Sequence, residues 1–350
     1  MIAFLKKSWK KILVVLLSIA VLVFFVAFDP EFKNIENVIF KISPICFMLA
    51  FLCMIIYYVG DTAMYLIAAK LMNVPQPFFE GLLTTMIGVF YSAVTPLASG
   101  GQPFQIVQMK KRGIHTGTST SILMLKFLSW HAVITILGIT GMILLWRKDL
   151  FNSTAMLIMF IVGLIVHIIC LFIGIFLSIK PSIVERAGCK ILNFTERIFF
   201  KNKPEKLNKT RIAWNGFIAD YKQAMVFAAQ HKGGMVIIVL TGIIEVICYM
   251  ATTYFIYRGL GFNETGIVEI VLVQIMLTIS VAFIPLPGAS VASEGGFYAV
   301  FTEYFGASRS VGMLIWRILT YYMNILLGLI AVIIDGFRKQ NTTVHNDNEK

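Results

Sequence analysis

Long runs of apolar residues without charge are the feature that most limits how this chain can fold. Each run is close to or longer than the roughly 17–25 residues that a helix needs to cross about 30 Å of hydrocarbon. Because 58% of the 350 residues are hydrophobic and only 14% are charged, the composition excludes an ordinary soluble domain. The sequence therefore predicts an all-α polytopic membrane protein with six full transmembrane helices. These lie near residues 12–28, 42–69, 119–145, 155–179, 233–257 and 308–334.

Two further apolar runs, near residues 81–95 and 269–284, are shorter and end in proline. The first begins at Glu80 and the second at Glu269, and each reaches a Pro-Leu pair at the same spacing, with an offset of 189 between the runs. Each stands after two full spans and before one. We expect re-entrant broken-helix hairpins in two repeats of inverted topology, an arrangement in which interrupted helices form the substrate site of a transporter.

The hairpins are expected near residues 81–109 and 269–305, where proline and glycine interrupt the helix. Proline removes a backbone donor and glycine relaxes the backbone, which leaves peptide groups that lipid cannot satisfy. Such backbone is stable only against protein, water or a polar ligand. A kinked helix packed on its neighbours is the alternative interpretation. The predicted helix breaks are Pro96, Gly100, Gly101, Pro285, Pro287 and Gly288.

The repeats divide the chain into residues 1–150 and 151–337, with a disordered cytoplasmic tail at 338–350. If both hairpins turn back, most of the 30 lysines and arginines lie on the side of the two termini, which predicts a cell-membrane protein with cytoplasmic termini. Apolar residues every three or four positions in the basic segment 180–232 predict two amphipathic helices on the inner leaflet. A solvated connector is the alternative for this segment.

Several motifs together carry a family resemblance. The stretch PLPG followed by Glu294, an arginine in the next span at Arg317, and the stretch TPLASGGQPFQIVQMKKRGI resemble the transmembrane flippase region of the lysylphosphatidylglycerol synthase family over roughly residues 10–337. The resemblance implies a translocator that moves lipid headgroups between leaflets. In two-domain members an aminoacyl transferase follows the membrane region. Because this chain ends about a dozen residues after its last span, we expect no lysyl transfer and a separate synthase as a possible partner.

Ionisable groups inside the spans are the functional candidates, because a charge near the bilayer centre costs a few kcal/mol. Glu294 and Arg317 have opposite signs and can pair, and a guanidinium binds phosphate oxygens in a bidentate manner. The predicted coupling or gating acids are Asp61, Glu245 and Glu294. The predicted substrate-binding residues are Ser99, Gln102, Arg112, Lys126, Ser290, Ser293, Glu294 and Arg317.

The expected function is translocation of an anionic phospholipid, aminoacyl-phospholipid or glycolipid headgroup by alternating access. An ion-coupled carrier of a small solute would use the same inverted repeats, and an accessory subunit of a synthase is a further alternative. A membrane-embedded transferase with Glu294 or His131 as its base is also open, although the sequence contains no HExxH, GxSxG or P-loop motif. The five cysteines form no CxxC pair, so the sequence suggests neither a disulfide framework nor a zinc site. We also expect no other metal, no cofactor and no nucleic-acid partner.

Overall fold

The computed structural model describes residues 43–145, 154–195, 204–289 and 291–347, and these residues are nearly all helical. Within them, five helices are long and apolar enough to cross a membrane: α3 (Pro44–Leu71), α6 (Thr116–Leu145), α7 (Thr154–Ile179), α10 (Lys232–Gly259) and the continuous stretch Ala292–Arg338. They coincide with five of the six expected spans. The remaining span, at residues 12–28, lies outside the described residues.

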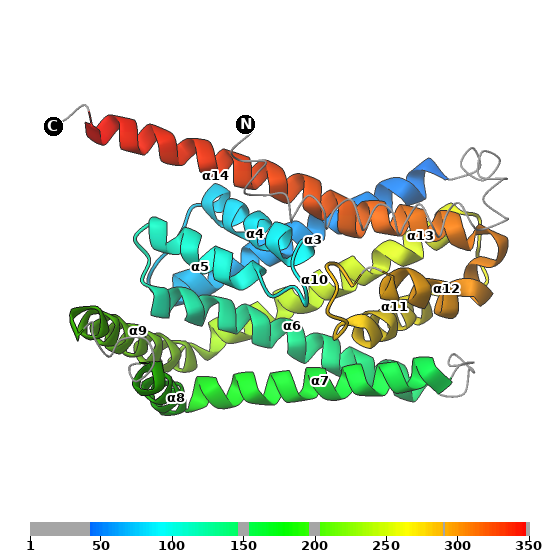
Figure 1. Cartoon of the computed structure of the whole chain (residues 1–350). Helices are drawn as coiled ribbons and strands as arrows, with labels where there is room; N and C mark the ends of the chain where they lie inside the picture. Colours follow the sequence, from blue (N-terminus) through cyan, green and yellow to red (C-terminus); the bar gives the residue numbers. More distant parts are fainter. Residues whose placement is uncertain (1–42, 146–153, 196–203, 290, 348–350) are drawn as a thin grey trace.

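Two shorter apolar helices are present where the sequence predicts the hairpins. They are α4 (Phe78–Ala93) and α11 (Ile267–Val281), which are shorter than the five span candidates. Each is followed by a loop and then by another short helix, α5 (Gly101–Lys111) or α12 (Ala292–Phe305). Figure 1 shows the α4 and α5 pair nearer one end of the bundle and the α11 and α12 pair nearer the other.

The last span is irregular at its centre. After the short turn η3 (Gly306–Ser308), helix α13 (Arg309–Arg317) leads into one π-helical turn, η4 (Ile318–Tyr322), and then into α14 (Met323–Asp347). A π turn inserts one extra residue into a helix and is frequent at functional sites. Helix α14 continues past residue 338, so residues 338–347 are helical where the sequence predicts a disordered tail.

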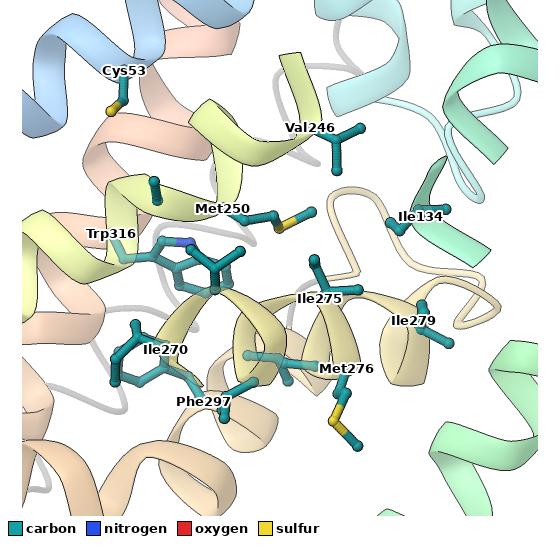
Figure 2. Packing of buried hydrophobic residues seen from close by; sticks show 14 of the residues in the cluster. Cys53, Ile134, Val246, Met250, Ile270, Ile275, Met276, Ile279, Phe297 and Trp316 are labelled. Atoms are coloured by element: carbon teal, nitrogen blue, oxygen red, sulfur yellow. The ribbon is translucent and has the colours of Figure 1, made fainter. Parts of the chain in front are cut away.

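Helix α11 lies at the centre of the largest hydrophobic cluster. It packs against α6, α7, α10 and α12, and Ile270, Val273, Ile275 and Ile279 have no exposed surface. Figure 2 shows how Val246 and Met250 of α10, Ile134 of α6 and Phe297 of α12 surround it. Because protein covers this short helix on several sides, its interrupted backbone is kept away from lipid, as a broken helix in a membrane requires.

Glycines allow close helix approaches around both short helices. A Cβ atom on Gly328 of α14 would lie 2.5 Å from the Phe90 Cβ of α4, and one on Gly138 of α6 would lie 2.3 Å from the Ile279 Cδ1 of α11. Small residues at such crossings let two backbones approach each other in a membrane. Each short helix is therefore held closely by the span that follows the other short helix.

Helices α8 (Pro181–Thr195) and α9 (Pro204–Gln230) form the basic segment and lie together at one end of the bundle (Figure 1). The apolar face of α9, with Tyr221, Met225 and Ala228, is buried, and α9 packs against α6. This face was expected on the inner leaflet and instead contacts protein. On α8, Ile191 and Phe194 are exposed, so that helix keeps an apolar surface that a membrane could cover.

Candidate functional site

The loops that interrupt the two short helices meet each other. Pro96, after α4, and Pro287, after α11, form an isolated antiparallel β-bridge. Each proline is followed by two residues with left-handed backbone: Leu97 and Ala98 in the first loop have φ values of 54° and 53°, and the second loop has 59° and 48° at the matching places. Left-handed backbone is costly for residues other than glycine, so the same unusual conformation is built twice at one contact.

The loop geometry changes how the two short helices and their loops align with each other. The short helices begin at Phe78 and Ile267, which keeps the offset of 189 found in the sequence. The bridge prolines and the helices that follow them, which start at Gly101 and Ala292, are instead related by an offset of 191. The structural partner of Pro96 is therefore Pro287, two residues beyond the Pro285 that matched it in sequence. Two extra residues thus lie between the start of the second short helix and its bridge proline.

A buried ion pair stands directly behind the second loop. Arg317 Nε lies 2.8 Å from Glu294 Oε1, and the two side chains are only 5% and 2% exposed. Both terminal nitrogens of Arg317 also donate to the Gly288 carbonyl at 3.4 Å. The pair that the sequence suggested is thus confirmed, and it is attached to the loop backbone. The second carboxylate oxygen of Glu294 accepts no hydrogen bond from the described part of the chain.

Tyr321 connects this ion pair to both loops. The Arg317 guanidinium lies over the Tyr321 ring at 5.2 Å, and the Tyr321 hydroxyl donates to the Ala93 carbonyl at the end of α4. A Cβ atom on Gly288 would come within 2.1 Å of the same ring. Gly288 therefore satisfies two requirements, a positive φ and a close approach, and a larger residue there would push the loop from the tyrosine.

The predicted polar contacts of the loops differ in their surroundings. Ser293 is buried and donates to the Gly288 carbonyl, so it lies beside Arg317 and Glu294. Ser99 is exposed and donates to the Pro96 carbonyl, which closes its own loop. Gln102 is exposed at the start of α5. Ser290 lies outside the described residues.

Arg112 belongs to a separate network at the end of α5. It forms ion pairs with Glu80 at 2.5 Å and Asp335 at 3.5 Å, and it donates to the Glu80 carbonyl. Arg338 pairs with Glu80 as well, at 2.5 Å. This network joins α4, α5 and α14, and none of the ion pairs named here includes Arg317. The geometry therefore does not support a substrate-binding role for Arg112 beside Glu294 and Arg317.

A second charged cluster lies where α3, α6 and α10 cross. Lys126 Nζ is 2.5 Å from Asp61 Oδ1, with side chains 11% and 14% exposed. Glu245 of α10 is 3% exposed, and its Cβ would lie 3.3 Å from a Cβ on Gly60, the neighbour of Asp61. The predicted coupling acids Asp61 and Glu245 are therefore close together, and Lys126 pairs with Asp61 rather than with Glu294.

Sequence reasoning did not single out the tyrosines and amides that hold these clusters. Tyr321 carries no signal beyond that of an aromatic residue in an apolar span. Gln105 is 5% exposed and donates to the Thr84 carbonyl, which joins α5 to α4. The position of Gln105 between apolar residues of α5 is the one sequence signal that could have indicated its buried hydrogen bond. Asp335 lies near the end of the last span, where an acid is normally solvated.

Comparison with known proteins agrees with the family resemblance. Residues 11–328 match the family described as the lysylphosphatidylglycerol synthase TM region. The chain is also similar to a UPF0104 membrane protein of Archaeoglobus fulgidus, with 22% identity over 327 residues that cover 91% of this chain and 94% of the archaeal protein. Because the family match covers most of the sequence, this chain belongs to the family of lysylphosphatidylglycerol synthase transmembrane regions.

Proposed function

We propose that this protein moves an anionic, phosphate-containing lipid headgroup between the leaflets of the cell membrane by alternating access. The observation that carries the proposal is the buried ion pair of Arg317 and Glu294 behind the two joined loops. A guanidinium in a water-poor site binds phosphate oxygens strongly and in a bidentate manner. Phospholipids, aminoacyl-phospholipids and lipid-linked sugars share this phosphate.

An inverted repeat supports alternating access. Helices α3 and α10, α4 and α11, and α5 and α12 follow one another in the same order in the two halves. The antiparallel bridge pairs a residue with its own counterpart, as an axis of twofold symmetry between the halves requires. Helix α4 packs on α14 while α11 packs on α6, so the halves exchange contacts reciprocally. We therefore interpret the chain as six spans and two re-entrant hairpins, with cytoplasmic termini.

The ion pair gives the translocation step a physical basis. A phosphate that reaches Arg317 competes with Glu294 for the guanidinium and replaces one carboxylate by another anion. Because Arg317 also holds the Gly288 carbonyl, this exchange acts on the second loop and through the bridge on the first. Rocking of one half against the other about the bridge would then expose the headgroup to the opposite side, with its tails still in lipid.

The test is a flipping assay in liposomes that contain fluorescent phosphatidylglycerol, an aminoacyl-phospholipid or a polyprenyl-linked sugar, with outer-leaflet quenching. Arg317→Ala should abolish translocation while the protein still inserts and remains monodisperse. Arg258→Ala, at the end of α10, is the matched arginine control and should flip normally. Equal quenching with and without protein for all three lipids would contradict lipid translocation and favour the solute carrier.

A further inference from the structure

The cluster of Asp61, Lys126 and Glu245 would carry a net negative charge if both acids were ionised, because it contains two carboxylates and one ammonium. Lys126 forms its ion pair with Asp61, and one ammonium neutralises only one carboxylate. Glu245 packs against Gly60, the neighbour of Asp61, and its Oε2 atom is buried without a hydrogen-bond partner in the described part of the chain. An uncompensated carboxylate buried among helices is very unfavourable, so Glu245 needs a bound cation.

The surroundings of Glu245 favour a proton over a metal ion. Sodium sites in transporters are built from unwound carbonyls and helix ends. Glu245 instead lies in the middle of α10, whose backbone is continuously helical. The described residues also contain no group of three or more His, Cys, Asp or Glu side chains that could hold a metal ion. A single hydrogen on the carboxylate satisfies the charge without further ligands.

Two tyrosines join this cluster to the ion pair at the loops. Tyr57 lies one turn before Asp61 on α3, and its ring centroid lies 4.7 Å from that of Tyr249. Tyr249 lies one turn after Glu245 on α10, and α10 packs against α13, the helix that ends at Arg317. The elements around Glu245 therefore present Asp61 and Tyr57 from α3, Lys126 from α6 and Tyr249 from α10. Helix α11 carries Glu269 as its only titratable group, in its first turn.

We propose that Glu245 is an exchangeable proton site, balanced against the ion pair of Asp61 and Lys126 and connected to Arg317 through Tyr57 and Tyr249. When Glu245 releases its proton, its carboxylate competes with Asp61 for Lys126. The proton passes to water and no covalent bond other than the O–H bond breaks. The coupling of this site to lipid movement rests on the proposed function, whereas the proton site itself does not.

Infrared spectroscopy of the purified full chain in lipid nanodiscs tests the site without any transport. The wild type should show the C=O band of a protonated carboxylic acid at neutral pH, and this band should shift in D2O. Glu245→Gln should remove it, and Glu269→Gln, at an acid bonded to the Tyr304 hydroxyl, should leave it. Asp61→Asn should also remove it, because Lys126 then becomes available to ionise Glu245.

Three results would overturn the proton site: a band that survives Glu245→Gln, a band that does not shift in D2O, or a band abolished by sodium chloride but not by choline chloride. The last result would assign a sodium site. Coupling is tested separately with fluorescent phosphatidylglycerol in vesicles of phosphatidylglycerol and phosphatidylethanolamine. A pH gradient should change the flipping rate of the wild type, and Glu245→Gln should lose this dependence while it still flips lipid without a gradient. An unchanged dependence would contradict coupling, and absence of flipping in the wild type would contradict only the proposed function and the coupling that rests on it.

Discussion

Lys126 and Arg317 each follow a bridge proline, Pro96 or Pro287, by the same interval of 30 residues. Arg317 is buried, the Lys126 side chain is 11% exposed, and both are paired with an acid. The acids come from different places, since Asp61 is in α3, which precedes α4, whereas Glu294 is in α12, which follows α11. The first pair therefore links α3 to α6, and the second links α12 to α13. The two bridge prolines are thus followed at the same interval by a basic residue, but the two basic residues pair with acids on different helices.

The buried pair of Glu294 and Arg317 should show strong thermodynamic coupling. Glu294→Gln leaves Arg317 buried without its counter-charge, and breaking such a pair typically costs about 3–5 kcal/mol. Combining Glu294→Gln with Arg317→Met should cost less than the sum of the single changes, because the stranded charge is gone. Thermal unfolding of the four proteins in one detergent measures this cycle. Additive losses would show that the two side chains do not stabilise each other.

Gly163 of α7 should tolerate no larger residue. A Cβ atom there would lie 2.0 Å from the Ile279 carbonyl oxygen, a backbone atom that cannot rotate away. Gly163→Ala should destabilise the protein by about 1–3 kcal/mol or more, as overpacking does. Gly233→Ala, at a helical glycine with no atom within 4 Å of the new Cβ, should be neutral or stabilising by up to about 1 kcal/mol. Equal unfolding midpoints for the two variants would refute the close approach of α7 and α11.

The left-handed backbone at Leu97 predicts an unusual stabilising change. A left-handed residue other than glycine costs roughly 1–2 kcal/mol, part of which the flexibility of glycine in the unfolded chain offsets. Leu97→Gly should therefore stabilise the protein by up to about 1 kcal/mol. Leu286→Gly is the control, because Leu286 also follows a proline and is partly exposed but has no positive φ. It should destabilise. A lower unfolding midpoint for Leu97→Gly would contradict the loop geometry.

Arg112 and its neighbour Lys111 should differ in their effect on stability. Arg112 is 19% exposed and bonds two carboxylates and a backbone carbonyl, and hydrogen bonds to charged groups contribute about 1.5–3 kcal/mol each. Lys111 is 46% exposed and lies 3.9 Å from Asp335, a surface pair worth about 0–1 kcal/mol. Arg112→Ala should therefore lower the unfolding midpoint clearly, whereas Lys111→Ala should change it little. The reverse order would show that the network is solvated.

The apolar runs predicted the helices well, because the length of a span and the need to satisfy its backbone depend on local sequence alone. Pro96 and Pro285, which end the two short apolar runs, likewise lie within four residues of the ends of α4 and α11. The pairing of Glu294 with Arg317 could be suggested because so few opposite charges lie within the spans. The family was also recognised from these motifs.

Contacts between distant segments could not be predicted in the same way. Nothing in the sequence shows that Lys126 contacts Asp61 rather than Glu294, since both acids are available to it. The match of Pro-Leu pairs placed Pro285 opposite Pro96, and only the backbone revealed Pro287 as its partner. The apolar face of α9 has the periodicity of a membrane-surface helix, which does not distinguish lipid from α6 as the surface that covers it.

The π turn from Ile318 to Tyr322 gives the last span an adjustable register. If this turn tightened to regular α geometry, the one surplus residue would have to be absorbed elsewhere, and Arg317 would rotate by about 100° relative to α14. Such a rotation would swing its guanidinium from one side of the helix to another without any bending of the axis. A change confined to this one turn would therefore rotate a single cationic side chain about the helix axis while the two ends of the span stay in place.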